Sequence, residues 1–209
     1  MFGFFKKFAE ATENRAIDDA VLRMAAEQGV AQAQRDLGKC YYNGQGVPQN
    51  YAEAVKWYRK AADQGDVIAC CCLGYCYDQG QGVAQNHKEA IEWFRKAADS
   101  GDATAQRNLG LFYYEGKGVA VNFVEAAKWH RMAANQGLAD AENDLAICYF
   151  SGNGVSRDLV EAAKWLNLAS SQNHAPAKRN LSKIEQKMTR EQIAEAQQLA
   201  REFKPHKKS

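Results

Sequence analysis

The chain has few prolines and little net charge, and it lacks long apolar runs. Three prolines among 209 residues leave room for many uninterrupted helices. A net charge of +2 is too balanced to favour a nucleic acid or an anionic membrane surface as partner. No apolar run approaches the ~20 residues of a membrane-spanning helix, so we expect no membrane span. The chain is 46% hydrophobic and 25% charged, which is typical of a folded protein in water.

The first residues, MFGFFKKFAEAT, do not have the pattern of a secretory signal. Their apolar part is short, lysines interrupt it, and no Ala-x-Ala site follows. We therefore expect a cytoplasmic protein with reduced thiols. Two alternatives stay open for Phe2, Phe4, Phe5 and Phe8: they pack on the first helix, or they touch a membrane surface.

The sequence repeats itself every 36 residues. The four tryptophans, Trp57, Trp93, Trp129 and Trp165, keep this step, and so do a glycine at the end of each unit and a Gly-x-Gly-Val segment in its middle. The repeat predicts the following parts: an N-terminal segment with a capping helix (1–29), repeats at 30–65, 66–101, 102–137 and 138–173, C-terminal capping helices (174–204) and a tail (205–209).

Each repeat is predicted to hold two helices, called helix A and helix B here. Helix A ends at the first glycine of Gly-x-Gly-Val, which tolerates the positive φ of a C-cap. Asp66 and Asp102 are placed to cap the helices A that follow them. Helix B begins at an Asn or Asp with a glutamate three residues later, which is the pattern of a capping box. These N-cap residues are Asn50, Asn86, Asn122 and Asp158.

Small residues in the middle of each helix A allow a close approach of helix B. They are Gly38, Gly74, Gly110 and Ala146. Because one repeat cannot bury both of its apolar faces, neighbouring repeats must stack. We expect each tryptophan to be a core anchor in that stack. His130 occupies the helix B position held elsewhere by Tyr58, Phe94 and Leu166, so we interpret it as a packing residue.

This repeating pattern resembles the Sel1-like repeat over about residues 30–187. The matching residues of the first repeat are Ala31, Ala33, Leu37, Gly38, Tyr41, Gly44, Gly46, Val47, Ala54, Trp57, Ala61, Ala62 and Gly65. The resemblance implies an all-α fold: a right-handed α/α superhelical solenoid, related to tetratricopeptide repeats, whose helices A line a concave surface. It also implies a scaffold or adaptor that binds a partner protein or peptide. The balanced charge, independently of the resemblance, indicates no nucleic-acid partner.

Two other functions follow from the same resemblance. One is a toxin-neutralising, immunity-type or regulatory partner. The other is a small-molecule, β-lactam-like binder or hydrolase, as in a cysteine-rich branch with a disulfide in each repeat. Residues 102–137 contain no cysteine, so the pattern of that branch is absent. The four histidines have neither catalytic nor zinc-binding spacing, and we expect no enzyme activity, no cofactor and no metal.

We predict that a partner binds the face of helix A opposite the packing positions, where the repeats differ in sequence. The candidates are Arg35, Lys39 and Tyr42 in the first repeat, Cys71, Tyr75 and Asp78 in the second, Arg107, Leu111 and Tyr114 in the third, and Asn143, Ile147 and Phe150 in the fourth. Arginine mixed with aromatic residues is typical of protein interfaces. The alternative is that Leu111, Ile147 and Phe150 pack against the next helix, or that the array is only a spacer.

Four of the six cysteines lie in the segment GDVIACCCLGYCYDQG, residues 65–80. The repeat places this segment in a helix A, where Cys70, Cys71 and Cys72 point about 100° apart and cannot converge on one metal ion. Cys76 falls at a packing position, where cysteine acts as a small hydrophobe. Cys71 falls on the predicted partner-binding face, and we expect it to be partly exposed.

Overall fold

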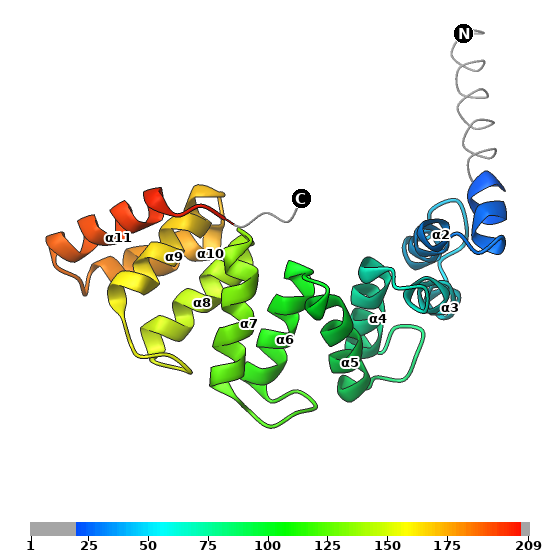
Figure 1. Cartoon of the computed structure of the whole chain (residues 1–209), viewed down its shortest axis with the longest axis horizontal. Helices are drawn as coiled ribbons and strands as arrows, with labels where there is room; N and C mark the ends of the chain where they lie inside the picture. Colours follow the sequence, from blue (N-terminus) through cyan, green and yellow to red (C-terminus); the bar gives the residue numbers. More distant parts are fainter. Residues whose placement is uncertain (1–19, 206–209) are drawn as a thin grey trace, which may run out of the picture. The chain divides into compact units, whose positions relative to one another are not determined.

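The structure, a computed structural model, describes residues 20–205 and is helical without strands in that range (Figure 1). After the helical residues 20–27, the helices are α2 (Ala31–Asn43), α3 (Tyr51–Ala62), α4 (Val67–Gln79), α5 (His87–Asp99), α6 (Ala103–Glu115), α7 (Phe123–Asn135), α8 (Ala139–Ser151), α9 (Leu159–Ser171), α10 (Ala175–Glu185) and α11 (Arg190–Glu202). The predicted all-α repeat fold is confirmed: α2, α4, α6 and α8 are helices A, and α3, α5, α7 and α9 are helices B. The phenylalanines of residues 2–8 and the end of the tail, residues 206–209, lie outside the described residues.

The chain forms two compact units, residues 1–96 and 97–209, with the boundary inside α5. In the first unit α3 packs against both α2 and α4. In the second unit α7 packs against α6 and α8, and α9 packs against α8, α10 and α11. In α3, α7 and α9, helix B therefore packs against the helix A of its own repeat and against the helix that follows it. The capping helices α10 and α11 cover the last repeat.

The predicted ends of helix A are confirmed. Gly44, the first glycine of its Gly-x-Gly-Val segment, has a left-handed φ of 69° and closes α2 with a backbone hydrogen bond to Cys40. The equivalent glycines close α4, α6 and α8 in the same conformation. At the other end, Asp66 Oδ1 accepts a hydrogen bond from the backbone N–H of Ala69 at 2.8 Å, so Asp66 caps α4 as predicted.

The start of helix B agrees with the prediction in one half only. Asn50 Oδ1 accepts the backbone N–H of Glu53 at 3.1 Å, as an N-cap should. The reciprocal half of the capping box is wrong for these helices, because the backbone N–H of Asn50 donates to the carbonyl of Tyr41 at 2.9 Å. The same bond recurs in the other repeats, from Asn86 to Tyr77, from Asn122 to Tyr113 and from Asp158 to Tyr149. It ties the N-cap residue of helix B to the last turn of helix A.

The small residues of helix A do bring helix B close. A Cβ built on Gly74 would lie 2.7 Å from the ring of Phe94, and one built on Gly110 would lie 2.5 Å from the ring of His130. His130 is 1% exposed, so its interpretation as a packing residue is confirmed. In the fourth repeat the equivalent residues are Ala146 and Leu166, both buried. A leucine side chain is smaller than an aromatic ring, so it leaves space for the Cβ of the alanine.

Three of the four tryptophans are core residues, as predicted. Trp93, Trp129 and Trp165 are at most 6% exposed. Trp57 is only half-buried, since it packs beside a small cluster that includes Leu37, and Lys60 Nζ lies 4.0 Å from its ring centroid. The expectation of a fully buried anchor is therefore wrong for the first repeat.

Candidate functional site

The twelve predicted partner-binding residues differ in exposure. Lys39, Tyr75 and Ile147 are exposed, with Tyr75 at 48% and Ile147 at 37%. Asn143 is buried. The others are half-buried, namely Arg35, Tyr42, Cys71, Asp78, Arg107, Leu111, Tyr114 and Phe150. These residues lie on one predicted face of helix A, but their side chains are exposed to water to different extents.

The two arginines of this set pair with carboxylates of the next repeat. Arg35 Nη1 lies 3.0 Å from Asp66 Oδ2, and Arg107 Nε donates to Asp144 Oδ2 at 2.7 Å. Both aspartates are largely shielded from water, so these ion pairs are less screened than pairs on an open surface. The arginines hold neighbouring helices A together, and this limits their freedom to bind a partner.

The two tyrosines Tyr42 and Tyr114 also contact the next repeat. The hydroxyl of Tyr42 donates to Gln81 Oε1, and the hydroxyl of Tyr114 accepts from Asn153 Nδ2 at 3.0 Å. Both bonds join residues 39 positions apart, so the hydroxyls are used in stacking the repeats. In the second repeat the same position holds Asp78, whose Oδ1 lies 3.2 Å from His87 Nδ1.

Asn143 is the clearest correction to the predicted site. It is 7% exposed, and its Oδ1 accepts a hydrogen bond from Asn180 Nδ2 of α10 at 2.9 Å. The prediction of an exposed residue is wrong because the capping helix covers this part of α8. The sequence predicts capping helices after residue 173, but local patterns do not show which side chains those helices cover.

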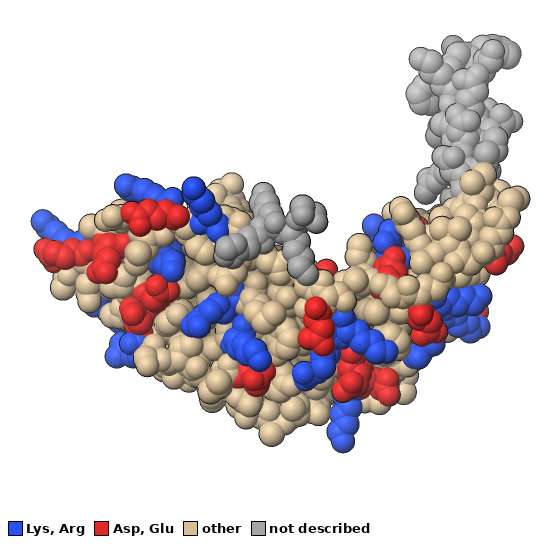
Figure 2. Space-filling view, in the orientation of Figure 1, with Lys and Arg blue, Asp and Glu red and all other residues tan. Residues whose placement is uncertain are grey.

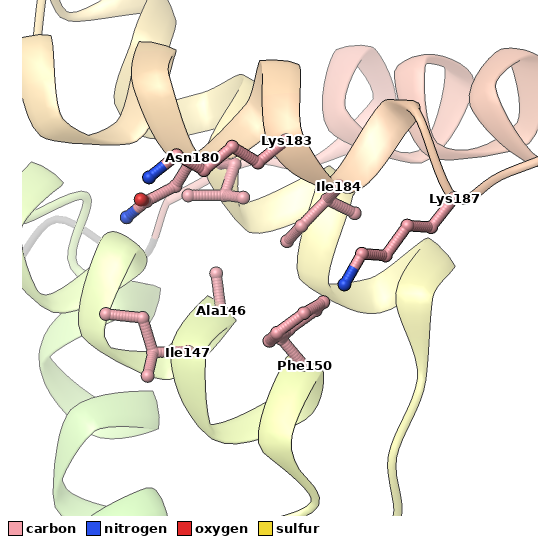
Figure 3. A pocket seen from close by; sticks show the side chains of 8 residues that line it. Ala146, Ile147, Phe150, Asn180, Lys183, Ile184 and Lys187 are labelled. Carbon is pink, nitrogen blue, oxygen red and sulfur yellow. The ribbon is translucent and has the colours of Figure 1, made fainter.

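Ile147 and Phe150 line a pocket together with α10 (Figure 3). Its volume is about 300 Å³. Ala146 and Leu166 also line the pocket, and α10 with the turn after it contributes Asn180, Lys183, Ile184 and Lys187. The α10 residues were not predicted from the sequence, although Lys183 stands 36 residues after Ile147 and extends the same face into the cap.

The pocket has an apolar interior and a positively charged rim. Figure 3 shows the side chains of Phe150 and Ile184 pointing toward one another, with Lys183 lying beside Asn180. Lys187 Nζ lies 4.9 Å from the ring centroid of Phe150, which is a cation–π contact. Both lysines are exposed, and within residues 20–205 neither has a carboxylate at ion-pair distance. On the face seen in Figure 2, acidic and basic side chains are interspersed.

Cys71 and Cys76 lie as their repeat positions predict, whereas Cys40, at the position of Cys76 in the first repeat, is only half-buried. Cys76 and Cys148 are fully buried, and burial raises the pKa of the Cys76 thiol to about 12 and that of Cys148 to about 11. Cys71 is half-buried, so the expectation of partial exposure is met. Between residues 20 and 205, no group of three His, Cys, Asp or Glu side chains is placed to hold a metal ion. The same range contains no helix that is both long and apolar enough to span a bilayer.

Stacked two-helix units of one repeated pattern define the chain as an α/α solenoid repeat protein. The Sel1 repeat model matches residues 31–66, 67–102, 103–138 and 139–174. The chain therefore belongs to the Sel1 repeat family, as the sequence pattern predicts. No curated protein matches the chain.

Several solved structures are similar to the chain. A Sel1 repeat protein from Oxalobacter formigenes is 34% identical with a TM-score of 0.77, over 93% of this chain and 78% of its own. The protective antigen c5321 of uropathogenic Escherichia coli, which has the same fold, is 33% identical with a TM-score of 0.59, over 88% of this chain and 48% of its own. The immunity protein Pa5087 of Pseudomonas aeruginosa is 23% identical with a TM-score of 0.51, over 88% and 70%, which shows a likeness of fold alone.

Proposed function

We propose that this protein is a scaffold without catalytic activity that binds a partner protein or peptide through the outward side chains of its helices A. The observation that carries the proposal is the apolar pocket of Ile147 and Phe150, which opens on this face and is not filled by the chain's described residues. Large apolar side chains left in contact with water in a grouped arrangement mark binding surfaces. Tyr75 presents a further exposed aromatic ring from the equivalent position of α4.

The alternative functions gain no separate support. No disulfide joins the six cysteines, all of which lie among the described residues, so the cysteine-rich β-lactam-binding branch remains a poor match. The likeness to an immunity protein concerns the fold. A toxin-neutralising protein would be one special case of the proposed scaffold, in which the partner is a toxin. We place the protein in the cytoplasm as part of the same proposal.

Site-specific photo-crosslinking in the native cell tests this function. A photoreactive phenylalanine analogue replaces Ile147 or Tyr75 on helices A, and Val124, which is 64% exposed on α7, is the matched control on a helix B. We expect Ile147 or Tyr75 to crosslink a discrete protein that Val124 does not. Equal crosslinking from all three positions, or none from the two helix A positions, would contradict a specific helix A surface.

A further inference from the structure

The contact between α8 and α10 differs in chemistry from the contact between α6 and α8. Between the third and fourth repeats, Arg107 pairs with Asp144. One repeat later, the equivalent residues are Asn143 and Asn180, which form a neutral amide pair at 2.9 Å. Neither asparagine carries a charge, so this pair offers no carboxylate to the lysines of the pocket. Lys183 lies beside Asn180 of this pair, and Lys187 lies at the other end of the pocket against the ring of Phe150 (Figure 3).

We propose that the pocket between α8 and α10 binds an apolar side chain of an acidic partner segment, whose flanking carboxylates pair with Lys183 and Lys187. The inference rests on the proposed scaffold function and names the chemistry of its partner. A volume of about 300 Å³ is at the lower end for small-molecule sites and suits one or two inserted side chains such as Leu or Phe. Phe150 and Ile184 provide the apolar contact, and the lysines favour a negatively charged neighbour.

Other occupants fit the site less well. The N-terminal segment MFGFFKKF supplies aromatic side chains, but its own lysines would be repelled by the two lysines of the rim. A nucleic acid needs a longer track of cations than two lysines beside an apolar pocket. The lysines of the rim favour negative charge, and the interior favours an apolar side chain. A short acidic peptide segment with one apolar residue provides both.

Fluorescence anisotropy with labelled peptides tests the proposal on the full chain. The probe is the peptide DEDLFDED, compared with KRKLFKRK, DEDAADED and MFGFFKKFAEAT. We expect the first peptide to bind best, and Lys183→Glu with Lys187→Glu to weaken it by about tenfold. A matched charge reversal of Lys88 and Lys128, which are exposed on helices B, should leave its affinity within about twofold. The methyl NMR signals of Ile147 and Ile184 should shift on binding.

The other outcomes overturn separate parts of the argument. Equal binding of DEDLFDED and DEDAADED would remove the apolar anchor, and equal binding of KRKLFKRK would remove the charge selection. Preferred binding of MFGFFKKFAEAT would identify the chain's own first segment, in the same or a second copy, as the occupant. If Ile147 crosslinks a partner in cells while DEDLFDED has no preference, the scaffold function stands and the acidic partner falls. If DEDLFDED binds as expected and no partner is crosslinked, the selectivity of the pocket stands and the scaffold function falls.

Discussion

The buried carboxyl group of Glu142 should make stability depend on pH. Gln34 and Gln106 occupy its position in the first and third repeats. Gln106 Nε2 donates to the carbonyl of Ala98 at 3.1 Å, while its Oε1 accepts from Gln136 at 2.8 Å. Glu142 keeps only the accepting half, from Gln172 at 3.0 Å. When ionised, the Glu142 side chain has no proton to donate, so it cannot make the hydrogen bond to a backbone carbonyl that Gln106 makes.

The size of this effect on the free energy of unfolding follows from the burial of Glu142. Glu142 is 1% exposed, and burial raises its pKa from the ordinary 4.5 to about 7. Because the pKa is higher in the folded state, the carboxyl group costs nothing while it is protonated in both states, below about pH 4.5. The cost grows as the pH rises toward 7 and levels off at about 3 kcal/mol above it. Glu142→Gln removes the charge and restores the donor, so it should stabilise the protein most at pH 8.

Urea unfolding between pH 4.5 and 8.5, followed by helical circular dichroism, measures this effect. We expect the stability difference between Glu142→Gln and the unchanged protein to be small at pH 4.5 and about 3 kcal/mol at pH 8. The reverse change in the third repeat, Gln106→Glu, is the matched test and should introduce the same pH dependence. Glu195→Gln on α11, where the side chain is exposed, is the neutral control. A difference that stays constant with pH would refute the reasoning.

Three further predictions follow from other contacts. Burial lowers the pKa of His130 from 6.5 to about 4, so the neutral ring stabilises the fold above pH 6.5 and this contribution is lost as pH falls through 4. His130→Phe should flatten thermal melting temperatures between pH 6.5 and 4. Gly74→Ala should destabilise by about 1–2 kcal/mol in urea unfolding, because overpacking against Phe94 outweighs the gain in helix propensity. Adding Phe94→Leu, which reproduces the Ala–Leu pair of the fourth repeat, should recover part of the loss. Iodoacetamide at pH 8 should alkylate half-buried Cys71 well before fully buried Cys76 in the native protein, as read by peptide mass spectrometry.

Each of these predictions has an outcome that contradicts it. An unchanged acid transition in His130→Phe would mean that another group controls acid unfolding. A stabilised Gly74→Ala variant would mean that the Phe94 ring moves aside at little cost. Alkylation of Cys76 before Cys71 would show that the assignment of helix faces in α4 is wrong, and unfolding in urea, which should equalise the two rates, is the control.

The sequence alone determined the repeat, its register and the ends of its helices. These depend on local chemistry: glycines with positive φ at the end of helix A, side-chain caps at the start of helix B, and small residues where a ring must fit. A period of 36 residues also identifies equivalent positions, which is why the burial of Cys76 and His130 was predicted correctly. An equivalent position in the repeat, however, does not tell which side chain of the next repeat contacts a given residue.

Only the tertiary structure decided how the outward face of helix A is used. Arg107 is held by a carboxylate and Tyr114 by an amide, each from the following repeat, and Asn143 is covered by α10. These contacts join residues 37 or 39 positions apart, so they depend on how one helix lies against the next rather than on any local pattern. The pocket of Ile147 and Lys183 arises in the same way, because a cavity forms only where two helices have been brought together and their side chains leave space.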